Sequence, residues 1–319
     1  MRLDRSRLNW GVFLIVLGAV PLAYHQGAVS LSTLSDAWRL WPLVLVGIGL
    51  RLVLSRTPAR FVGGLLVAAC LGLVIGSLFA VGPQLGCGNH GSATNTISRD
   101  GSFDGGAQVE LDVQCGRANV TTSADGQWHV RASSSGGNGA TVNSTPTSLS
   151  VRSDDRGGWR FDRAEDNWDV SLPSGPSIGL TVSIDAGDAH FNLGGANLSS
   201  ASFSVNAGAL HIDLTNARLG SLSVSTNVGS ASLILDGNSS VSGSISTNVG
   251  SLDMCAPSGL GLRVRSSESL AASNFSGAGL VRVGDTWQTP GYDTAANKAD
   301  FNVSTSVGSL TLNPGGGCK

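Results

Sequence analysis

Two histidines, His190 and His211, are the first candidates for chemistry, because each follows by three residues a glycine that recurs every 21 residues. If the 21-residue units pair directly, the two imidazole rings lie roughly 5 Å apart. With Asp188 and Asp213 nearby, they could bind a metal ion. No third His or Cys joins this row, so the sequence favours solvated side chains on an outward face, and we predict no metal site.

A second row lies two residues before the recurring glycine and contains Asp185, Asn206, Asn227 and Asn248. Oxygen ligands of this kind suit Ca²⁺. Only one of the four side chains is charged, and the GGxGxD signature of calcium-binding β-rolls is absent from the sequence. We therefore expect an Asn ladder that satisfies the backbone of turns.

The third candidate is the charged stretch "DDRGGWRFDRAEDNWDV", which begins at Asp154. Paired carboxylates could serve glycoside hydrolysis. The interleaved arginines, together with Trp159 and Trp168, are more typical of a solvated loop anchored by aromatic rings, or of a patch for a partner. The sequence also lacks GxSxG, HExxH, Walker and GxGxxG motifs. We predict no catalytic residues, no cofactor and no enzymatic activity.

A repeat must position all of these candidates, and a glycine marks the centre of each unit. The segments "TVSIDAGDAHFNL", "SFSVNAGALHIDL", "SVSTNVGSASLIL" and "SISTNVGSLDMCA" place their glycines 21 residues apart, and "VELDVQCGRANV" and "FNVSTSVGSLTL" fit the same template. Internal repeats of this length indicate a solenoid-like stack. The six repeat glycines are Gly116, Gly187, Gly208, Gly229, Gly250 and Gly308.

Apolar residues alternate on both sides of each glycine, as Val205 does before Gly208 and Leu210 and Ile212 do after it, but the two alternations are out of phase by one residue. Because side chains on a strand alternate faces, the second set would turn outward unless the backbone bends at the slip. We therefore predict that each glycine is a corner between two strands of about six residues. The irregular stretches 121–178 and 256–300 are predicted to be excursions from the stack or its caps.

The first 83 residues differ sharply from the rest, because they contain almost all of the long apolar runs. Residues Phe61–Gly82 form an uncharged run of 22 residues, long enough to cross a hydrocarbon core of roughly 30 Å. The shorter runs Trp10–Tyr24 and Trp41–Leu54 each span the membrane or together form a shallower hairpin. We predict about three transmembrane helices.

Arginines set the expected orientation of this membrane region. Arg2, Arg5 and Arg7 precede the first run, Arg51 lies near the end of the second, and Arg56 and Arg60 lie between the second and third. By the positive-inside rule the N-terminus is cytoplasmic and the chain after Gly82 is extracytoplasmic. A cleaved signal peptide is the competing interpretation, which the three-run pattern disfavours.

Four cysteines fall on the predicted outer side, where disulfides persist. They are Cys87, Cys115, Cys255 and Cys318. Their spacing matches no zinc pattern, and three pairings are open. The net charge of −2 gives no overall attraction to nucleic acid, and we expect no nucleic-acid partner.

Both halves of the chain resemble known bacterial domains. The membrane half, with "NWGVFLIVLGAVPL" followed by "LWPLVLVGIGLRLVL", resembles the transmembrane region of LiaF-like proteins. The outer half, with "WDVSLP", "GLTVSIDAGDAHFNLGGANL", "FSVNAGALHIDL" and "ADFNVSTSVGSLTL", is similar to the toast-rack or adhesin-type β-solenoid domains attached to such regions. We therefore expect a transmembrane helical region over 1–83, a linker over 84–100 and an all-β solenoid, or toast rack, with 21-residue repeats over 101–319.

The resemblance implies a bacterial membrane protein that restrains or tunes a membrane histidine kinase in the cell-envelope stress response. No catalytic residues belong to the family pattern. We expect contacts with the lipid bilayer, with a membrane histidine kinase or another envelope protein, and between copies of the chain. The alternative is a surface adhesin or envelope scaffold with no signalling role.

Overall fold

The computed structural model describes residue 15 and residues 87–88, 94–135, 139–153 and 163–318 of the 319-residue chain. The three apolar runs expected to cross the membrane lie outside these residues, apart from Ile15. None of the helices within the described ranges has the length and apolar character needed for a membrane span. The chain divides into two units at Leu85–Gly86, and the strands all belong to the second unit.

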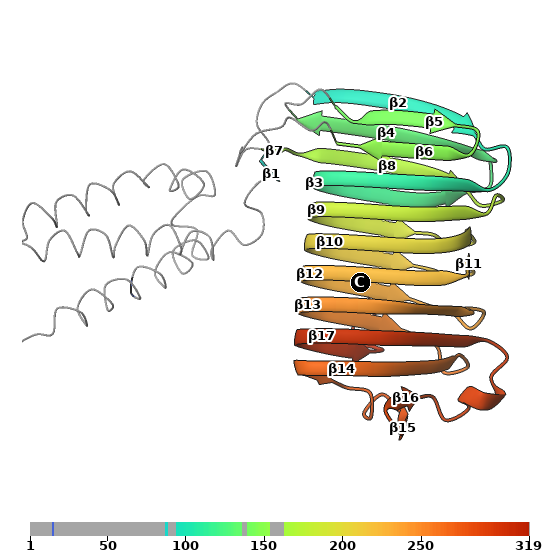
Figure 1. The fold of residues 1–319 in the computed structure, drawn as a ribbon, viewed down its shortest axis with the longest axis vertical. Coiled ribbons are helices and arrows are strands. Elements are labelled where there is room, and N and C mark those ends of the chain that lie inside the picture. Colours follow the sequence, from blue (N-terminus) through green and yellow to red (C-terminus); the bar gives the residue numbers. More distant parts are fainter. Residues whose placement is uncertain (1–14, 16–86, 89–93, 136–138, 154–162, 319) are drawn as a thin grey trace, which may run out of the picture. The chain divides into compact units, whose positions relative to one another are not determined.

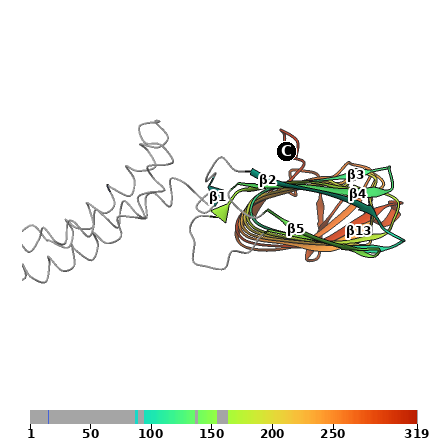
Figure 2. The ribbon, with the colours of Figure 1, turned by 90° about the horizontal axis from the view of Figure 1, so that it is seen from above.

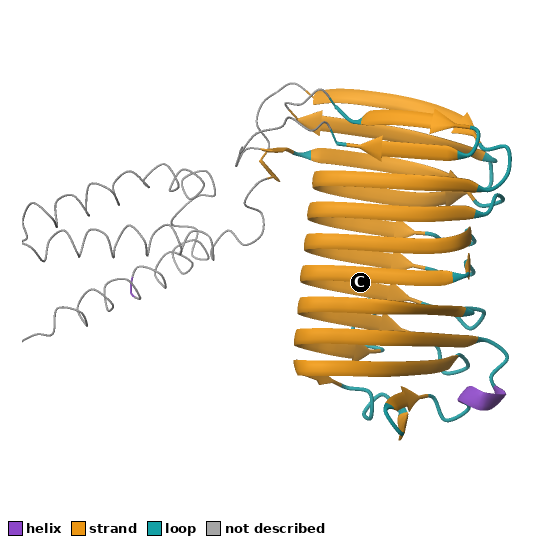
Figure 3. Cartoon of the chain, in the orientation of Figure 1, coloured by secondary structure: helices purple, strands orange, loops and turns teal. Residues whose placement is uncertain are grey.

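The second unit is a stack of parallel coils, each built from one long strand (Figure 1). From the β2 end, the long strands are β3 (Ala107–Ser123), β9 (Ile178–Asn192), β10 (Asn197–Asp213), β12 (Ser221–Ile234), β13 (Val241–Cys255), β17 (Lys298–Leu312) and β14 (Gly261–Ser273). Figure 2 shows the coils superposed as a flattened loop, in which each strand runs along one face, bends, and returns along the other. The connections lie on the side opposite the bends (Figure 3).

The register between β10 and β12 has the period expected from the sequence. Gly208 pairs with Gly229 and Phe203 with Val224, so neighbouring residues are 21 apart along the chain. The same in-register pairing joins β9 to β10, β12 to β13 and β13 to β17. Identical positions of successive units therefore form straight rows across the stack.

Each repeat glycine lies at the bend and has a positive φ, from 139° at Gly116 to 147° at Gly308. The bend turns the residues on both sides of it toward one core, so Val205 before Gly208 and Leu210 after it are both buried. A second reason for glycine is the close approach of the next coil. A Cβ atom at Gly229 would lie 1.8 Å from the carbonyl oxygen of Gly208, a distance that no side chain tolerates.

The interior between the two faces is one continuous core, to which almost every long strand contributes. The rings of Phe191 and Phe203 meet edge to face, with centroids 4.7 Å apart. Threonine replaces the branched aliphatic residue three positions before the glycine in three adjacent coils. The hydroxyl groups of Thr226, Thr247 and Thr305 are buried and have no hydrogen-bond partner.

Irregular stretches cap both ends of the stack. At one end, the coil next to β3 is made of two strands, β6 (Ser148–Arg152) and β8 (Asp166–Pro173). Antiparallel strands then cover this coil: β4 (Gln127–Ser135) and β2 (Thr94–Ser102) over β8, and β5 (Thr141–Thr145) over β6. Two short strands, β1 (Cys87–Gly88) and β7 (Arg163–Ala164), pair with each other beside this end.

At the other end, a hairpin and a short helix follow the last coil. The hairpin is β15 (Val281–Val283) with β16 (Thr286–Gln288), and the 3₁₀ helix η4 spans Tyr292–Thr294. β16 pairs antiparallel with β14 at only two positions. A further short strand, β11 (Arg218–Leu219), precedes β12 in the chain and pairs in parallel with the start of β10.

The order of the last coils differs from their order in the sequence. The repeat around Gly308 is the last of the six in the sequence but not the last layer of the stack, because β17 lies between β13 and β14 and pairs in parallel with both. The strand that takes the terminal layer instead, β14, carries Ala271 where the other coils carry the repeat glycine. The terminal coil therefore pairs with β17 without a corner glycine of its own.

Replacing Gly229 by Val tests the corner. The substitution forces a β-branched side chain into positive φ and against the Gly208 carbonyl, so we expect loss of the folded stack, by about 3 kcal/mol or more. The measurement is the thermal unfolding of the β-sheet signal of the full chain in nanodiscs. Gly237→Ala is the matched control, since a Cβ there meets no atom within 4 Å. A Gly229→Val protein as stable as its parent would refute the corner.

Replacing Thr247 by Val tests the buried hydroxyl row. Val has nearly the same shape but needs no hydrogen bond, so we expect the free energy of unfolding to rise by about 1 kcal/mol. Val205→Thr, the reverse change at the same position of another coil, should lower it by a similar amount. If Thr247→Val proves destabilising, the hydroxyl has a partner in solution.

Candidate functional site

The Asn row forms a hydrogen-bonded ladder along the bends. The Nδ2 of Asn206 donates to Oδ1 of Asp185 at 3.0 Å, Asn227 donates to Asn206 at 2.8 Å, and Asn248 donates to Asn227 at 2.9 Å. We expected these side chains to satisfy turn backbone, whereas these bonds join the side chains to one another. The in-register stacking makes this arrangement available, because it repeats the same amide at every coil. One side-chain oxygen each of Asp185, Asn206 and Asn227 therefore accepts a hydrogen bond of the ladder.

The two candidate histidines are neighbours on adjacent strands. His190 of β9 pairs with His211 of β10, and the ring centroids are 5.8 Å apart with the planes tilted by 43°. The Nδ1 of His211 shares a hydrogen bond of 2.5 Å with the hydroxyl of Ser232 on the next coil. Among the described residues, no group of three His, Cys, Asp or Glu side chains is arranged to hold a metal ion.

The charged stretch does not form one loop in its described part. Residues 154–162, including Trp159, lie outside the described residues, and β8 begins at Asp166. Trp168 is fully buried, and Asp166 is buried with its carboxylate accepting a hydrogen bond from the Ser153 hydroxyl. Asp169 is exposed on the opposite face of β8 and accepts a hydrogen bond from Asn119. These two carboxylates face opposite ways, so they cannot flank one glycosidic bond.

Two of the four outer cysteines join in a disulfide. Cys255, the last residue of β13, is bonded to Cys318, which lies 63 positions later in the sequence, and their Cα atoms are 5.9 Å apart. This bond fixes the chain that follows β17 to the end of β13. Cys115 is buried and also disulfide-bonded, and Cys87 lies in β1.

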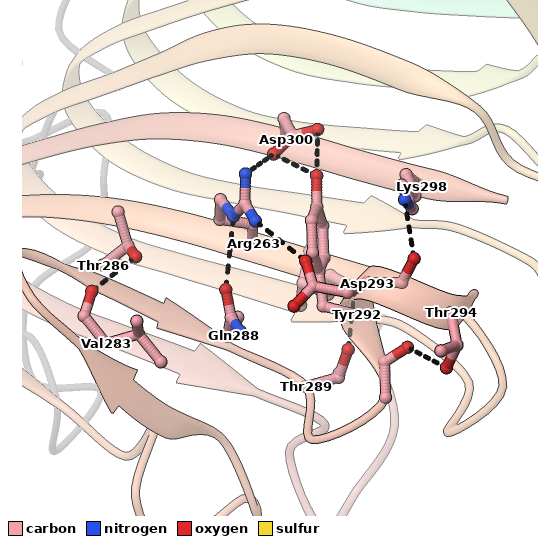
Figure 4. Close-up of polar contacts among 12 residues, drawn as sticks. Arg263, Val283, Thr286, Gln288, Thr289, Tyr292, Asp293, Thr294, Lys298 and Asp300 are labelled. Atoms are coloured by element: carbon pink, nitrogen blue, oxygen red, sulfur yellow. Dashed lines mark hydrogen bonds and ion pairs between the residues drawn. The ribbon is translucent and has the colours of Figure 1, made fainter.

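A polar cluster at the β14 end was not foreseen from the sequence, and we name it the Tyr292 clasp (Figure 4). The hydroxyl of Tyr292 in η4 lies 2.8 and 2.7 Å from the two carboxylate oxygens of Asp300 on β17. The guanidinium carbon of Arg263 on β14 lies 3.7 Å from the centre of the tyrosine ring, and the Lys298 ammonium lies 5.2 Å from it. Both distances are those of cation–π contacts.

The Tyr292 clasp fastens the segment between β16 and β17 to the stack. Arg263 also makes long ion pairs with Asp300 and Asp293, at 3.9 and 3.7 Å, and its Nε donates to Gln288. Burial raises the pKa of the Tyr292 phenol, and the hydrogen bond to Asp300 and its charge raise that pKa further. The sequence contains no pattern that predicts the clasp, because its residues come from three different elements, β14, η4 and β17.

Family models and a solved structure agree with this architecture. Residues 9–89 match the LiaF transmembrane domain, and residues 88–235 match the N-terminal domain of toast_rack, DUF2154. The chain joins a LiaF transmembrane domain to a toast-rack domain. Both halves of the resemblance seen in the sequence are thereby confirmed. This is a membrane protein of LiaF type.

One solved structure shows the same fold at low sequence identity, and a second has a lower structural similarity. A protein from Clostridium sporogenes, provisionally described as a cell adhesion protein, has a TM-score of 0.51 at 14% identity over 69% of this chain and 99% of its own. A protein from Bacteroides fragilis, provisionally described as an adhesin, is 11% identical over 68% of this chain and 97% of its own, with a TM-score of 0.26. No curated protein matches the chain.

The toast-rack stack continues beyond the residues that match the family model. The match ends at Leu235, yet β13 and β17 pair in register with the coils before them. The core also runs on through Leu262 of β14. One structural unit therefore extends from the capping strands near residue 94 to the disulfide at Cys318.

Replacing Tyr292 by Phe tests the clasp. The variant keeps the ring but loses the hydrogen bonds to Asp300, so we expect faster hydrogen exchange over residues 289–297, corresponding to about 1 kcal/mol, with β10 unaffected. Asp293→Asn is the control, because this exposed carboxylate makes only one long ion pair. Equal exchange in the two variants would contradict the proposed fastening.

Tyr292→Phe also tests how the stability of the Tyr292 clasp depends on pH. The folded protein holds the Tyr292 proton more tightly than the unfolded chain does. The contribution of the Tyr292–Asp300 hydrogen bond to stability is therefore present below about pH 10 and is lost as pH rises through the raised pKa of Tyr292. We expect exchange of residues 289–297 to accelerate above about pH 10 in the parent protein, beyond the ordinary base dependence seen in β10, and this excess to be absent from Tyr292→Phe.

Proposed function

We propose that this protein is a non-enzymatic accessory of cell-envelope stress signalling, which restrains or tunes a membrane histidine kinase through protein contacts. The observation that carries the proposal is the pairing of a LiaF transmembrane domain with a toast-rack domain in one chain. A rigid stack of hydrogen-bonded coils suits a protein that presents surfaces to partners.

We also propose that the toast-rack domain is extracytoplasmic. The positive-inside distribution of the arginines supports this placement. The disulfide between Cys255 and Cys318 agrees with it, because disulfides persist in oxidising compartments outside the cytoplasm. The domain would then receive the envelope signal, and both it and the membrane region would contact the kinase.

The structure offers one exposed apolar row to a protein partner. Val228, Val249 and Val307 pair across β12, β13 and β17 at the bends, and their exposed fractions are 46%, 47% and 44%. They lie directly before the repeat glycines and beside the Asn ladder, in rows set by the coil spacing. We name this row the valine stripe. Contiguous exposed apolar groups of this kind mark interaction sites.

The test is crosslinking and capture of the tagged full-length protein from native membranes. We expect a histidine kinase among the captured proteins, and we expect its yield to fall when all three valines of the stripe are changed to serine. Val281→Ser with Val283→Ser is the matched control, since these valines of β15 are equally exposed but lie at the end of the stack.

The regulatory role and the location of the domain are tested by different outcomes. Capture that returns no kinase or other signalling protein overturns the regulatory role and leaves the adhesin or scaffold alternative, for which the fold of the Clostridium sporogenes protein provides the precedent. The side of the membrane on which the toast-rack domain lies is tested separately, by labelling a Ser200→Cys variant on intact cells with a membrane-impermeant maleimide. A cysteine that stays unlabelled until the cells are opened overturns the extracytoplasmic placement.

A further inference from the structure

We propose that the toast-rack domain has a binding site for a neutral sugar unit, in an open hollow on its outer surface at the β2 end of the stack. The hollow has a volume of about 200 Å³. Four strands line it, through residues 98–100 of β2, 129–131 of β4, 169–171 of β8, and Asn119 and Thr121 of β3. These strands are neighbours in one sheet (Figure 1). This proposal does not depend on the regulatory role above.

The alternation of side chains along the strands makes the hollow polar. Val130 and Val170 point into the core and are buried, so the residues on either side of them point outward. These outward neighbours are His129, Arg131, Asp169 and Ser171. β2 adds Ser98 and Asp100, which pair across the strands with two of these neighbours. The polar side chains of the hollow are exposed or half-buried, and a ligand can reach them.

Two charged groups of the hollow have no partner within the protein. Arg131 lies directly opposite Asp169 on the neighbouring antiparallel strand, where opposite charges usually interact. In the part of the chain that the structure describes, however, the Arg131 guanidinium makes no hydrogen bond or ion pair, and neither does the carboxylate of Asp100. Both groups therefore keep their full hydrogen-bonding capacity for a ligand.

Other groups of the hollow are held in position by contacts at its edge. The Nδ2 of Asn119 donates to Oδ1 of Asp169 at 3.3 Å, which leaves the amide oxygen of Asn119 open to a ligand. The Nε2 of His129 lies 3.0 Å from a carboxylate oxygen of Asp125, and the other oxygen of Asp125 accepts from the Gln127 amide at 3.0 Å. Side chains that are oriented in advance lose less entropy when a ligand binds.

The charge balance and the mixture of groups favour a sugar over an ion. The lining contains two arginines, Arg99 and Arg131, and two aspartates, Asp100 and Asp169, so with a neutral His129 its formal charge is zero. A small anion or cation would meet groups of its own sign. The other polar side chains are hydroxyls and one amide, which both donate and accept hydrogen bonds. A saccharide has several hydroxyl groups on one ring and can use the charged and the neutral groups together.

The size of the hollow suits one sugar ring. A cavity of about 150 Å³ holds a benzene molecule, so about 200 Å³ accepts a six-membered ring with some of its hydroxyl groups in solvent. Because the hollow is open, further units of a glycan can remain outside it. No Trp, Tyr or Phe is among the lining residues, so the sugar is held by hydrogen bonds without stacking and we expect weak binding.

The experiment is saturation-transfer difference NMR on the full-length protein in nanodiscs, a method suited to weak binding. The probes are neutral oligosaccharides of glucose, mannose, xylose and N-acetylglucosamine, together with the four monosaccharides. Acetate and glycine betaine represent a small anion and a zwitterion. We expect transfer to at least one saccharide. A monosaccharide that binds as well as its oligosaccharide indicates a free sugar as the ligand, and a preference for the oligosaccharide indicates a unit of a longer glycan.

The double variant Asp100→Ala with Arg131→Met removes the two unpartnered charges. We expect its affinity for the saccharide to fall by about tenfold, the loss expected when one hydrogen bond to a charged group is removed. Asp285→Ala with Arg218→Met is the matched control, because it makes the same changes at exposed residues outside the hollow and should bind like the parent. An unchanged melting temperature shows that each variant is folded.

A second measurement keeps the test decisive if the double variant unfolds. The imidazole NMR signal of His129 is assigned by its absence from a His129→Gln variant. The saccharide should shift this signal in the parent protein and leave that of His211, two strands beyond β3, in place. The proposal is overturned if no saccharide shows transfer, if acetate or betaine shows transfer and the saccharides do not, if the His129 signal stays unmoved, or if the folded double variant binds as tightly as the control.

Discussion

The contact between a repeat glycine and the glycine carbonyl of the preceding coil, made from Gly187 onward, is the constraint on which the stack depends. A Cβ atom at Gly187, Gly208, Gly250 or Gly308 would lie within 1.8 Å of that oxygen, so only hydrogen fits between the coils at the bend. Because the glycines are in contact, the coils cannot slip by a residue without forcing a side chain into the gap. The corner that bends each strand also fixes its register.

The other rows of the stack follow from this register. The Asn ladder, the valine stripe, the histidine pair and the buried threonine row are each one position of the repeat copied across neighbouring coils. A favourable contact, such as that between Asn227 and Asn206, is repeated along the row. An unfavourable one is repeated too, as the unpartnered hydroxyls of Thr226, Thr247 and Thr305 show. In-register stacking therefore repeats favourable and unfavourable contacts alike at every coil of a row.

Local pattern made the middle of the domain predictable. The phase slip at Gly208 and the spacing of 21 residues together give the bend, the core face and the neighbours of each residue, which is why the separation expected for His190 and His211 is close to that observed. The ends could not be read in this way. Trp168 and Asp166 lie in a charged stretch whose composition resembles a loop, yet their strand is buried because β4 covers it. The Tyr292 clasp joins residues that only the folded cap brings together.

The position of β17 has a consequence for how the domain is made. β17 follows β14 in the sequence but fills an inner layer, between β13 and β14, so every coil from β3 to β13 is synthesised before the layer that separates β13 from β14 exists. The stack cannot be completed in the order of synthesis, and until β17 has been made β14 has no layer to rest on. A chain that stops before β17 therefore loses the place of its end cap as well as that strand, so assembly itself discriminates against copies that lack β17.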